Sequence, residues 1–295
     1  MKLGAIFPTP EIGNDPAAVR DWAQAAEGLG YDHIITYDHV LGAVHEGREP
    51  ALMGPYTERD PFHEPFVLFG YLAGQTSRIE LATGVLILTQ RQTALVAKQA
   101  AEVDVLSGGR MVLGVGTGWN WVEYDALGMA YGDRGKRLDE QVDLLRQLWR
   151  EPVIDFRGEF HRIDRAGILP QPARRIPILF GGFSEVALRR AARLGDGFLF
   201  GSTPKRMETL QKSLLQHLER EGRKPADFRC DAVVDFSQGP DAWREEFECW
   251  QGLGGTSLSL RAMDTASEAV GHEHVGYKGL GAYIDALEQF RDAVR

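Results

Sequence analysis

Short apolar runs alternate with amphipathic segments along the whole chain. The first run covers residues 3–7, and a helix at 3.6-residue spacing follows, capped by Asp15 and stopped by Gly30. The same pair, a strand and then a helix, recurs eight times. The predicted strands cover residues 3–7, 33–37, 79–88, 111–115, 176–180, 197–200, 229–236 and 256–260.

Eight strand–helix units predict an α/β fold, a single (β/α)8 TIM barrel over residues 1–295, rather than an open doubly wound sheet. A barrel of typical size, about 250 residues, leaves roughly 45 residues over. They form predicted insertions after strands 2 and 4 and before strand 5, the last a hairpin within residues 153–163. Ligands of such barrels bind where strands end, so candidate site residues are sought there.

Composition narrows the class of protein. With 43% hydrophobic residues in 295, the chain can bury a large core, and its formal net charge of −9 argues against a nucleic-acid partner. Its apolar runs are far shorter than the about 18 residues of a membrane span, and the chain opens on a strand rather than a signal peptide. Cys230 and Cys249 have no metal-like spacing. We expect a cytoplasmic protein with reduced thiols.

Two titratable residues follow the second predicted strand. His39 at a barrel mouth can donate or accept a proton near neutral pH, and Asp38 can orient a ring or bind a ligand hydroxyl. A buried structural histidine is the alternative. Both readings stay open from these residues alone.

The third strand carries a glycine inside an apolar run. Gly84 marks a bulge, a bend or a close approach by another group. Arg91 follows at the mouth, where it can meet an anion. From the pattern alone, a barrel bulge without function remains an alternative.

Glycines also end the fourth and fifth strands. The run from Gly116 to Gly118 lets backbone amides approach a ligand, but its spacing is not that of a dinucleotide-binding loop. Gly181 and Gly182 precede a helix capped by Ser184, which suits a phosphate, a close-lying ring or simply a tight turn.

Four further residues are candidates at the strand ends. Trp119 and Trp121 form either an aromatic wall for a flat ring or part of a loop core. Ser202 supplies a hydroxyl after strand 6, and Arg261 follows strand 8, where barrels often hold anions.

His272 and His274 have the spacing of a metal pair. The sequence offers no third and fourth ligand, so we expect no metal site there.

Taken together, these strand-end runs resemble the luciferase-like monooxygenase superfamily and its branch of F420-dependent oxidoreductases. The matching runs are residues 81–91, 97–110, 113–119, 123–128, 134–137 and 195–197. Their order and spacing agree over essentially the whole chain.

The resemblance implies a flavin or deazaflavin at the carboxyl-terminal mouth of the barrel. It implies a non-proline cis peptide between Gly84 and Val85 that bulges against the ring. It places His39 near the hydride-transfer carbon as acid or base, with Asp38 beside it. A homodimer is also implied. The residues expected to hold the ring edge, the ribityl phosphate and the anionic tail are Thr117, Gly118, Gly181, Gly182, Ser202 and Arg91.

The chain departs from the sugar-phosphate dehydrogenases of that branch. Their glutamate after Gly-Thr-Gly is Trp119 here, and their lysine after strand 6 is replaced by Pro204 or Lys205. We therefore expect a more apolar substrate, aromatic or lipid-like, in contact with Trp119, Trp121 and Arg261.

The function expected is hydride transfer between coenzyme F420 and an unidentified small organic molecule. A monooxygenase that uses reduced FMN and O2 is the close alternative, and a non-catalytic ligand-binding barrel is the second. In either enzyme, residues 41–65 are long enough to act as a lid.

Overall fold

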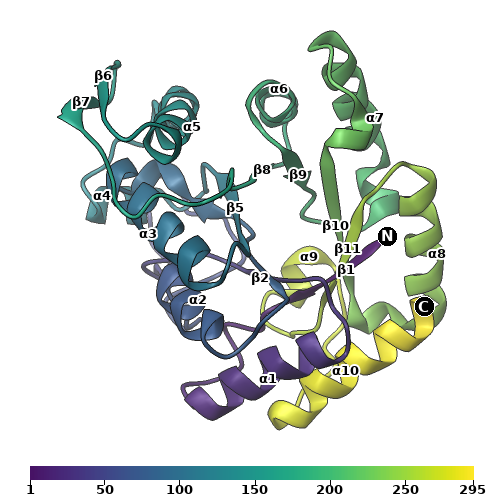
Figure 1. The fold of residues 1–295 in the computed structure, drawn as a ribbon. Helices are drawn as coiled ribbons and strands as arrows, with labels where there is room; N and C mark the ends of the chain where they lie inside the picture. The colour runs from purple at the N-terminus through teal and green to yellow at the C-terminus, as the bar shows by residue number, and fades with distance from the viewer.

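Parallel strands close into a barrel in the computed structural model, which describes residues 1–295 apart from the side chains of Glu268 and Val270 (Figure 1). β1 pairs with β2 on one side and with β11 on the other, and the ring closes where β3 and β4 both pair with β5. The barrel strands are β1 (Lys2–Ile6), β2 (His33–Thr36), β3 (Glu80–Thr83), β4 (Leu86–Ile87), β5 (Met111–Gly116), β8 (Ile178–Gly181), β9 (Gly197–Leu199), β10 (Arg229–Asp235) and β11 (Ser257–Arg261).

An outer layer of helices surrounds the strands and confirms the predicted (β/α)8 fold. Its main helices are α1 (Pro16–Gly28), α2 (Pro65–Ala73), α3 (Thr93–Leu106), α5 (Arg134–Arg150), α6 (Glu185–Leu194), α7 (Pro204–Arg220), α8 (Gly239–Gly252) and α10 (Gly279–Val294). The shorter elements are α4 (Trp121–Ala126), α9 (Ser267–Val270), the 3-10 helices η1 (Leu88–Gln90), η2 (Pro225–Asp227) and η3 (Phe236–Gln238), and the hairpin of β6 (Ile154–Arg157) with β7 (Arg162–Ala166).

The two chain ends meet at the amino-terminal end of the barrel. The side chain of Asp32 accepts a hydrogen bond from Leu3 N at 2.8 Å and lies 3.8 Å from the guanidinium of Arg295. The last helix, α10, lies beside α1, where Tyr31 donates to Leu287 O at 2.7 Å (Figure 1).

The barrel interior divides into two layers. A small apolar cluster that includes Ile6, Ile35 and Leu179 fills the middle. Toward the amino-terminal ends of the strands, His33 Nε2 lies 2.7 Å from Asp231 Oδ2. This filling leaves the carboxyl-terminal end of the barrel for a cavity.

The structure confirms the cis peptide between Gly84 and Val85 that the resemblance implied. The strand predicted over residues 79–88 is therefore divided, since β3 ends at Thr83 and pairing resumes at Leu86. The apolar run continues through this break, so hydrophobicity does not reveal it. Helix α4 was missed because six residues are too few to give a 3.6-residue pattern.

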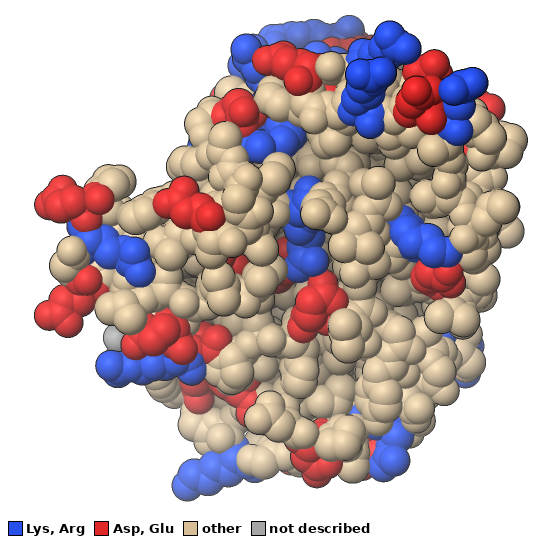
Figure 2. All heavy atoms as spheres, turned by 90° about the vertical axis from the view of Figure 1, so that its left-hand side faces the viewer, with Lys and Arg blue, Asp and Glu red and all other residues tan. Residues whose placement is uncertain are grey.

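The structure also bears on the predictions about the cysteines, membrane spans and surface charge. Cys230 is buried, Cys249 is half-buried, and both thiols are free, as expected. Within the described residues, no helix combines the length and apolar character that crossing a membrane requires. On the face shown in Figure 2, the described acidic and basic side chains are interspersed rather than gathered by sign.

Candidate active site

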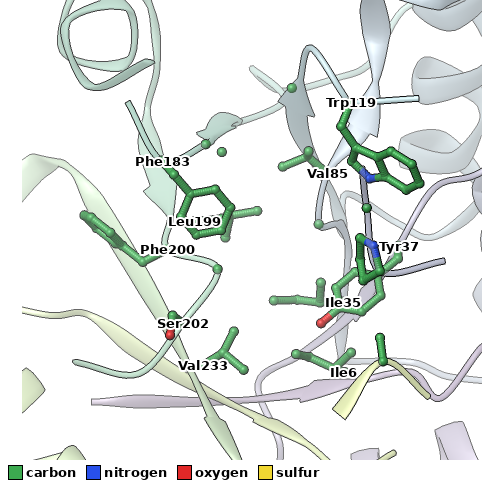
Figure 3. Close-up of a pocket in the computed structure, with 18 of the residues that line it drawn as sticks. Ile6, Ile35, Tyr37, Val85, Trp119, Phe183, Leu199, Phe200, Ser202 and Val233 are labelled. Atoms are coloured by element: carbon green, nitrogen blue, oxygen red, sulfur yellow. The ribbon is translucent and has the colours of Figure 1, made fainter. Parts of the chain in front are cut away.

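A cavity of about 740 Å³ opens at the carboxyl-terminal ends of the strands. Nearly every barrel strand, or the loop that follows it, contributes to the lining. Figure 3 shows Phe183, Leu199 and Val233 on one wall, facing Trp119 and Tyr37 on the other. A cavity of this size is typical of small-molecule sites.

Val85 is enclosed by glycines on neighbouring strands. A Cβ built on Gly116 would lie 2.5 Å from one Val85 methyl carbon, and a Cβ on Gly181 would lie 2.7 Å from the other. A Cβ on Gly84 would meet Ile35 Cγ2 at 2.2 Å. Glycine at these positions therefore lets the bulge fold into the barrel and leaves bare backbone facing the cavity.

Seven of the eight predicted cofactor residues line this cavity. They are Gly84, Val85, Thr117, Gly118, Gly181, Gly182 and Ser202. Gly118 has φ +60° and packs on Ile87, so a side chain there would be strained. Ser184 caps α6 by accepting from Ala187 N at 3.3 Å, as predicted, so the helix begins shortly after Gly182 and Phe183, which line the cavity.

Arg91 is the exception among the cofactor candidates. It is absent from the cavity lining, because its guanidinium is bound to two carboxylates: 2.6 Å to Asp38 Oδ1 and 2.9 Å to Glu64 Oε1. The structure therefore corrects its expected role at an anionic tail, since its charge is already neutralised. Ion pairs between residues this far apart in the chain are invisible to pattern reasoning.

Asp38 is buried and holds the backbone next to the bulge. Its Oδ2 accepts from Ile87 N at 2.8 Å, and its other oxygen meets Arg91. Burial raises the pKa of the Asp38 carboxyl, and the charge of Arg91 opposes that shift. Both oxygens are committed to protein donors, so Asp38 orients backbone rather than a ligand hydroxyl or the ring of His39.

His39 lines the cavity and is oriented from behind by Glu123. The Glu123 carboxylate lies 3.0 Å from His39 Nδ1 and also accepts from Val40 N at 2.6 Å. The ring packs edge-to-face against Phe62 and Trp119, with centroids 4.9 Å and 5.4 Å away. This arrangement favours the proton-transfer reading of His39 over a purely structural one.

Trp119 and Trp121, for which the sequence left the same two roles open, have different surroundings. Trp119 lies in the cavity lining, pressed so closely against Gly54 that a Cβ there would lie 2.3 Å from the indole. Trp121 begins α4 and is absent from the lining; Arg48 lies over its ring at 5.6 Å. Trp121 therefore lies outside the cavity, where the expected contact with substrate does not form.

Arg261 lines the cavity, but its charge is paired and most of its N–H donors are already used. It forms an ion pair with Asp235 and donates to Thr265 O and to Ser267 Oγ. His272 lies near this pair on the cavity wall, and burial lowers the pKa of its imidazole. Across the described residues, no three or more metal-ligating side chains gather into a possible ion site.

Sequence reasoning assigned no role to two neighbours on α4. Glu123 contacts His39 as described, and Tyr124 donates to Thr117 O at 2.6 Å and also hydrogen-bonds to Thr89. One short helix thus fixes both the histidine loop and the Gly-Thr-Gly loop. The signal was present in the family-like run 123–128, but nothing in it indicates which residues it meets.

Comparison with known proteins identifies the family of this chain. The model of the luciferase-like monooxygenase family matches residues 1–288. The chain belongs to this family.

Relatives of this luciferase-like chain include a protein of unassigned activity and one that is named as a dehydrogenase. An uncharacterised protein of Mycobacterium tuberculosis is 36% identical over 221 residues, which are 72% of this chain and 74% of that protein. An F420-dependent glucose-6-phosphate dehydrogenase of Nakamurella multipartita is 31% identical over 247 residues, 81% of this chain and 69% of that enzyme.

Solved structures share the luciferase-like barrel. A monooxygenase from Streptomyces bottropensis has a TM-score of 0.78 at 19% identity, over 99% of this chain and 98% of that one. An F420-dependent secondary alcohol dehydrogenase, solved with an F420–acetone adduct, has a TM-score of 0.76 at 16% identity, over 100% of this chain and 99% of that one. At these identities the likeness supports the fold alone.

Proposed function

We propose that this luciferase-like protein is an oxidoreductase that binds coenzyme F420 in its cavity and moves a hydride to or from a small organic molecule. The observation that carries the proposal is the wall of bare backbone around Val85, which lines the same cavity as His39, a residue that can exchange a proton. The named F420-dependent relative at 31% identity favours the same coenzyme.

The residues present fit a flat tricyclic ring with a phosphate-bearing tail. Gly116 and Gly181 present no side chains to the cavity, so a planar ring can approach the backbone there. The backbone amides that begin α6 after Gly182 can donate hydrogen bonds to a phosphate without any cationic side chain. The bulge and the glycines lie on one cavity, and α6 begins two residues after Phe183, which also lines it.

The cofactor supplies the two-electron chemistry, and the protein supplies orientation and proton transfer. His39 exchanges a proton with the substrate oxygen, because it lines the cavity beside the glycine wall. The rings of Tyr56, Phe62 and Trp119 surround the imidazole and keep bulk water from it.

The cavity favours an uncharged, largely apolar substrate. Within the described lining, Arg261 is the sole Lys or Arg side chain, and its guanidinium is bound to Asp235. Ile6, Ile35 and Val233 line the deep end. A neutral alcohol or ketone suits these walls better than a sugar phosphate, in contrast to the substrate named for the Nakamurella relative.

A second candidate is a monooxygenase that uses reduced FMN and O2. The aromatic enclosure of His39 favours it, since a reactive oxygen intermediate requires a site shielded from water.

Titration of the purified protein with F420 and, separately, with FMN tests the choice. We expect micromolar binding of F420, followed by turnover of the coenzyme with neutral alcohols or ketones. Micromolar FMN binding without F420 binding would overturn the first proposal in favour of the second. We also propose a homodimer, which multi-angle light scattering tests directly.

A further inference from the structure

We infer that Glu123 fixes the tautomer of His39, so that the nitrogen facing the cavity is the proton-accepting one whenever the imidazole is neutral. The inference rests on the proposed function, in which His39 exchanges a proton with the substrate. Glu123 is a positioning residue in this scheme, because it acts through His39 and is not among the residues that line the cavity.

Both carboxylate oxygens of Glu123 are occupied by donors. Oε1 accepts from Val40 N at 2.6 Å and from Leu41 N at 3.1 Å, and Oε2 lies 3.0 Å from His39 Nδ1. The residue is 1% exposed, so water does not compete for these positions. Oε1 receives two amide hydrogens and has no room for a proton of its own.

The charge of the carboxylate settles which atom carries the hydrogen. Burial by itself raises the pKa of Glu123, but the hydrogen bond and charge of His39, together with the amides of Leu41 and Val40, hold it below its usual range. An ionised carboxylate only accepts hydrogen bonds. His39 Nδ1 must therefore be the donor, which assigns the hydrogen of the neutral ring to Nδ1 and the lone pair to Nε2.

The ring is held in this orientation by its neighbours. Tyr56, Phe62 and Trp119 surround it edge-to-face, with centroids 5.4, 4.9 and 5.4 Å away. Turning the imidazole over would place a carbon atom against Glu123 and break the hydrogen bond. Within the described part of the chain, Nε2 has no hydrogen-bond partner, and the ring lines the cavity.

This tautomer suits the oxidation of an alcohol. His39 Nε2 would accept the hydroxyl proton of the alcohol, and a bound coenzyme would accept the hydride from the carbinol carbon, so that the alcohol becomes a carbonyl compound. The imidazolium that forms is paired with the Glu123 carboxylate. In the opposite direction the same imidazolium returns the proton to the carbonyl oxygen.

The variant Glu123→Gln tests the assignment directly. Its amide oxygen can still accept from Val40 N and Leu41 N, which turns its NH₂ group toward His39 Nδ1. Nδ1 must then accept, and the hydrogen moves to Nε2. Nitrogen NMR of ¹⁵N-histidine-labelled protein, with the His39 signals assigned by their loss in H39A, should show Nδ1–H in the wild type and Nε2–H in E123Q.

A matched control exists elsewhere in the chain. Glu140 contacts His161 Nδ1 at 2.8 Å and accepts from the amides of Glu159, Phe160 and His161, outside the cavity lining. E140Q should alter the His161 signals and leave turnover unchanged. E123Q should lower kcat for an alcohol by about 10²- to 10⁴-fold, with F420 affinity within about twofold of wild type.

The outcomes separate the two claims. An Nε2–H tautomer in the wild type would overturn the inference without any variant, and so would an unchanged tautomer in folded E123Q. A tautomer that switches without any loss of turnover would leave the assignment standing and overturn the proposed role of His39 in proton transfer.

Discussion

Val85 occupies the space that a side chain at position 181 would need. A Cβ built on Gly181 would lie 2.7 Å from Val85 Cγ1, closer than real carbon atoms approach. Gly116 stands in the same relation on the neighbouring strand, at 2.5 Å. The shape of this cavity wall therefore depends on two residues that have no side chain.

Replacing Gly181 by alanine should displace Val85 and the backbone beside it. We expect F420 affinity to fall at least tenfold, because small misplacements of a binding wall are amplified, while the added methyl destabilises the fold by about 1–3 kcal/mol. Fluorescence titration measures the F420 affinity, and thermal unfolding measures the loss of stability. Gly70→Ala is the control, since no atom lies within 4 Å of the built Cβ. Equal F420 affinity in G181A and wild type would contradict the proposal that F420 binds against this wall.

Trp119 and Trp121 should respond differently to truncation. W119A removes part of the cavity lining, so we expect KM for a neutral substrate to rise about tenfold, or ~1.4 kcal/mol. W121A lies outside the lining and should change stability without changing KM. Steady-state kinetics on both variants measures the contrast, and equal effects on KM would contradict the placement of the two rings.

Removing Arg91 should leave a buried carboxylate without its counter-charge. R91M is expected to destabilise the fold by about 3–5 kcal/mol, because Asp38 is 3% exposed and loses its ion pair. The double variant R91M/D38N should recover part of the loss, since no buried charge remains. Urea unfolding of both variants supplies the numbers. Equal stabilities for the single and double variants would show that the Asp38 charge is not what R91M exposes.

Glu27 gives a pH-dependent prediction. Its Oε2 accepts from the amides of Ser77, Arg78 and Ile79 at 2.7–2.9 Å. Burial by itself raises the pKa of Glu27, but these donors lower it to about 2, below the ordinary value of 4.5 for a glutamate. Because the folded pKa is the lower one, the stabilisation is complete above pH 4.5 and is lost as the pH falls toward 2.

The variant E27Q should therefore be less stable than wild type by about 1 kcal/mol at neutral pH, after allowance for solvent screening. The difference in free energy of unfolding should shrink between pH 4.5 and 2. Chemical unfolding of both proteins at pH 7 and at the acid end of this window provides the check. A difference that stays constant with pH would contradict the charge-based explanation.

The fold follows from the sequence because its signals are local. Leu138, Val142 and Leu145 repeat at helical spacing, and α5 spans Arg134–Arg150 as predicted. The pattern at Gly84 indicated a bulge or bend, and the cis peptide there was anticipated only through family resemblance. Spacing along the chain indicates secondary structure well and says little about what a loop residue meets.

The sequence predicted which strand-end residues line the site, but it did not predict which partners the charged side chains would have. Gly181 and Thr117 reach the cavity because strand ends converge in any barrel of this kind. Arg91 and Glu123 owe their roles to partners 53 and 84 residues away in the chain. Such pairings depend on the tertiary arrangement, which the sequence pattern does not encode locally.

Asp32 brings both chain ends to the floor of the barrel, at the opposite end from the mouth. A purification tag, a fluorescent protein or a surface anchor added at residue 1 or at residue 295 would therefore lie far from the mouth of the barrel and would not block ligand entry. The protein is accordingly suited to immobilisation through either terminus with the binding side facing solution.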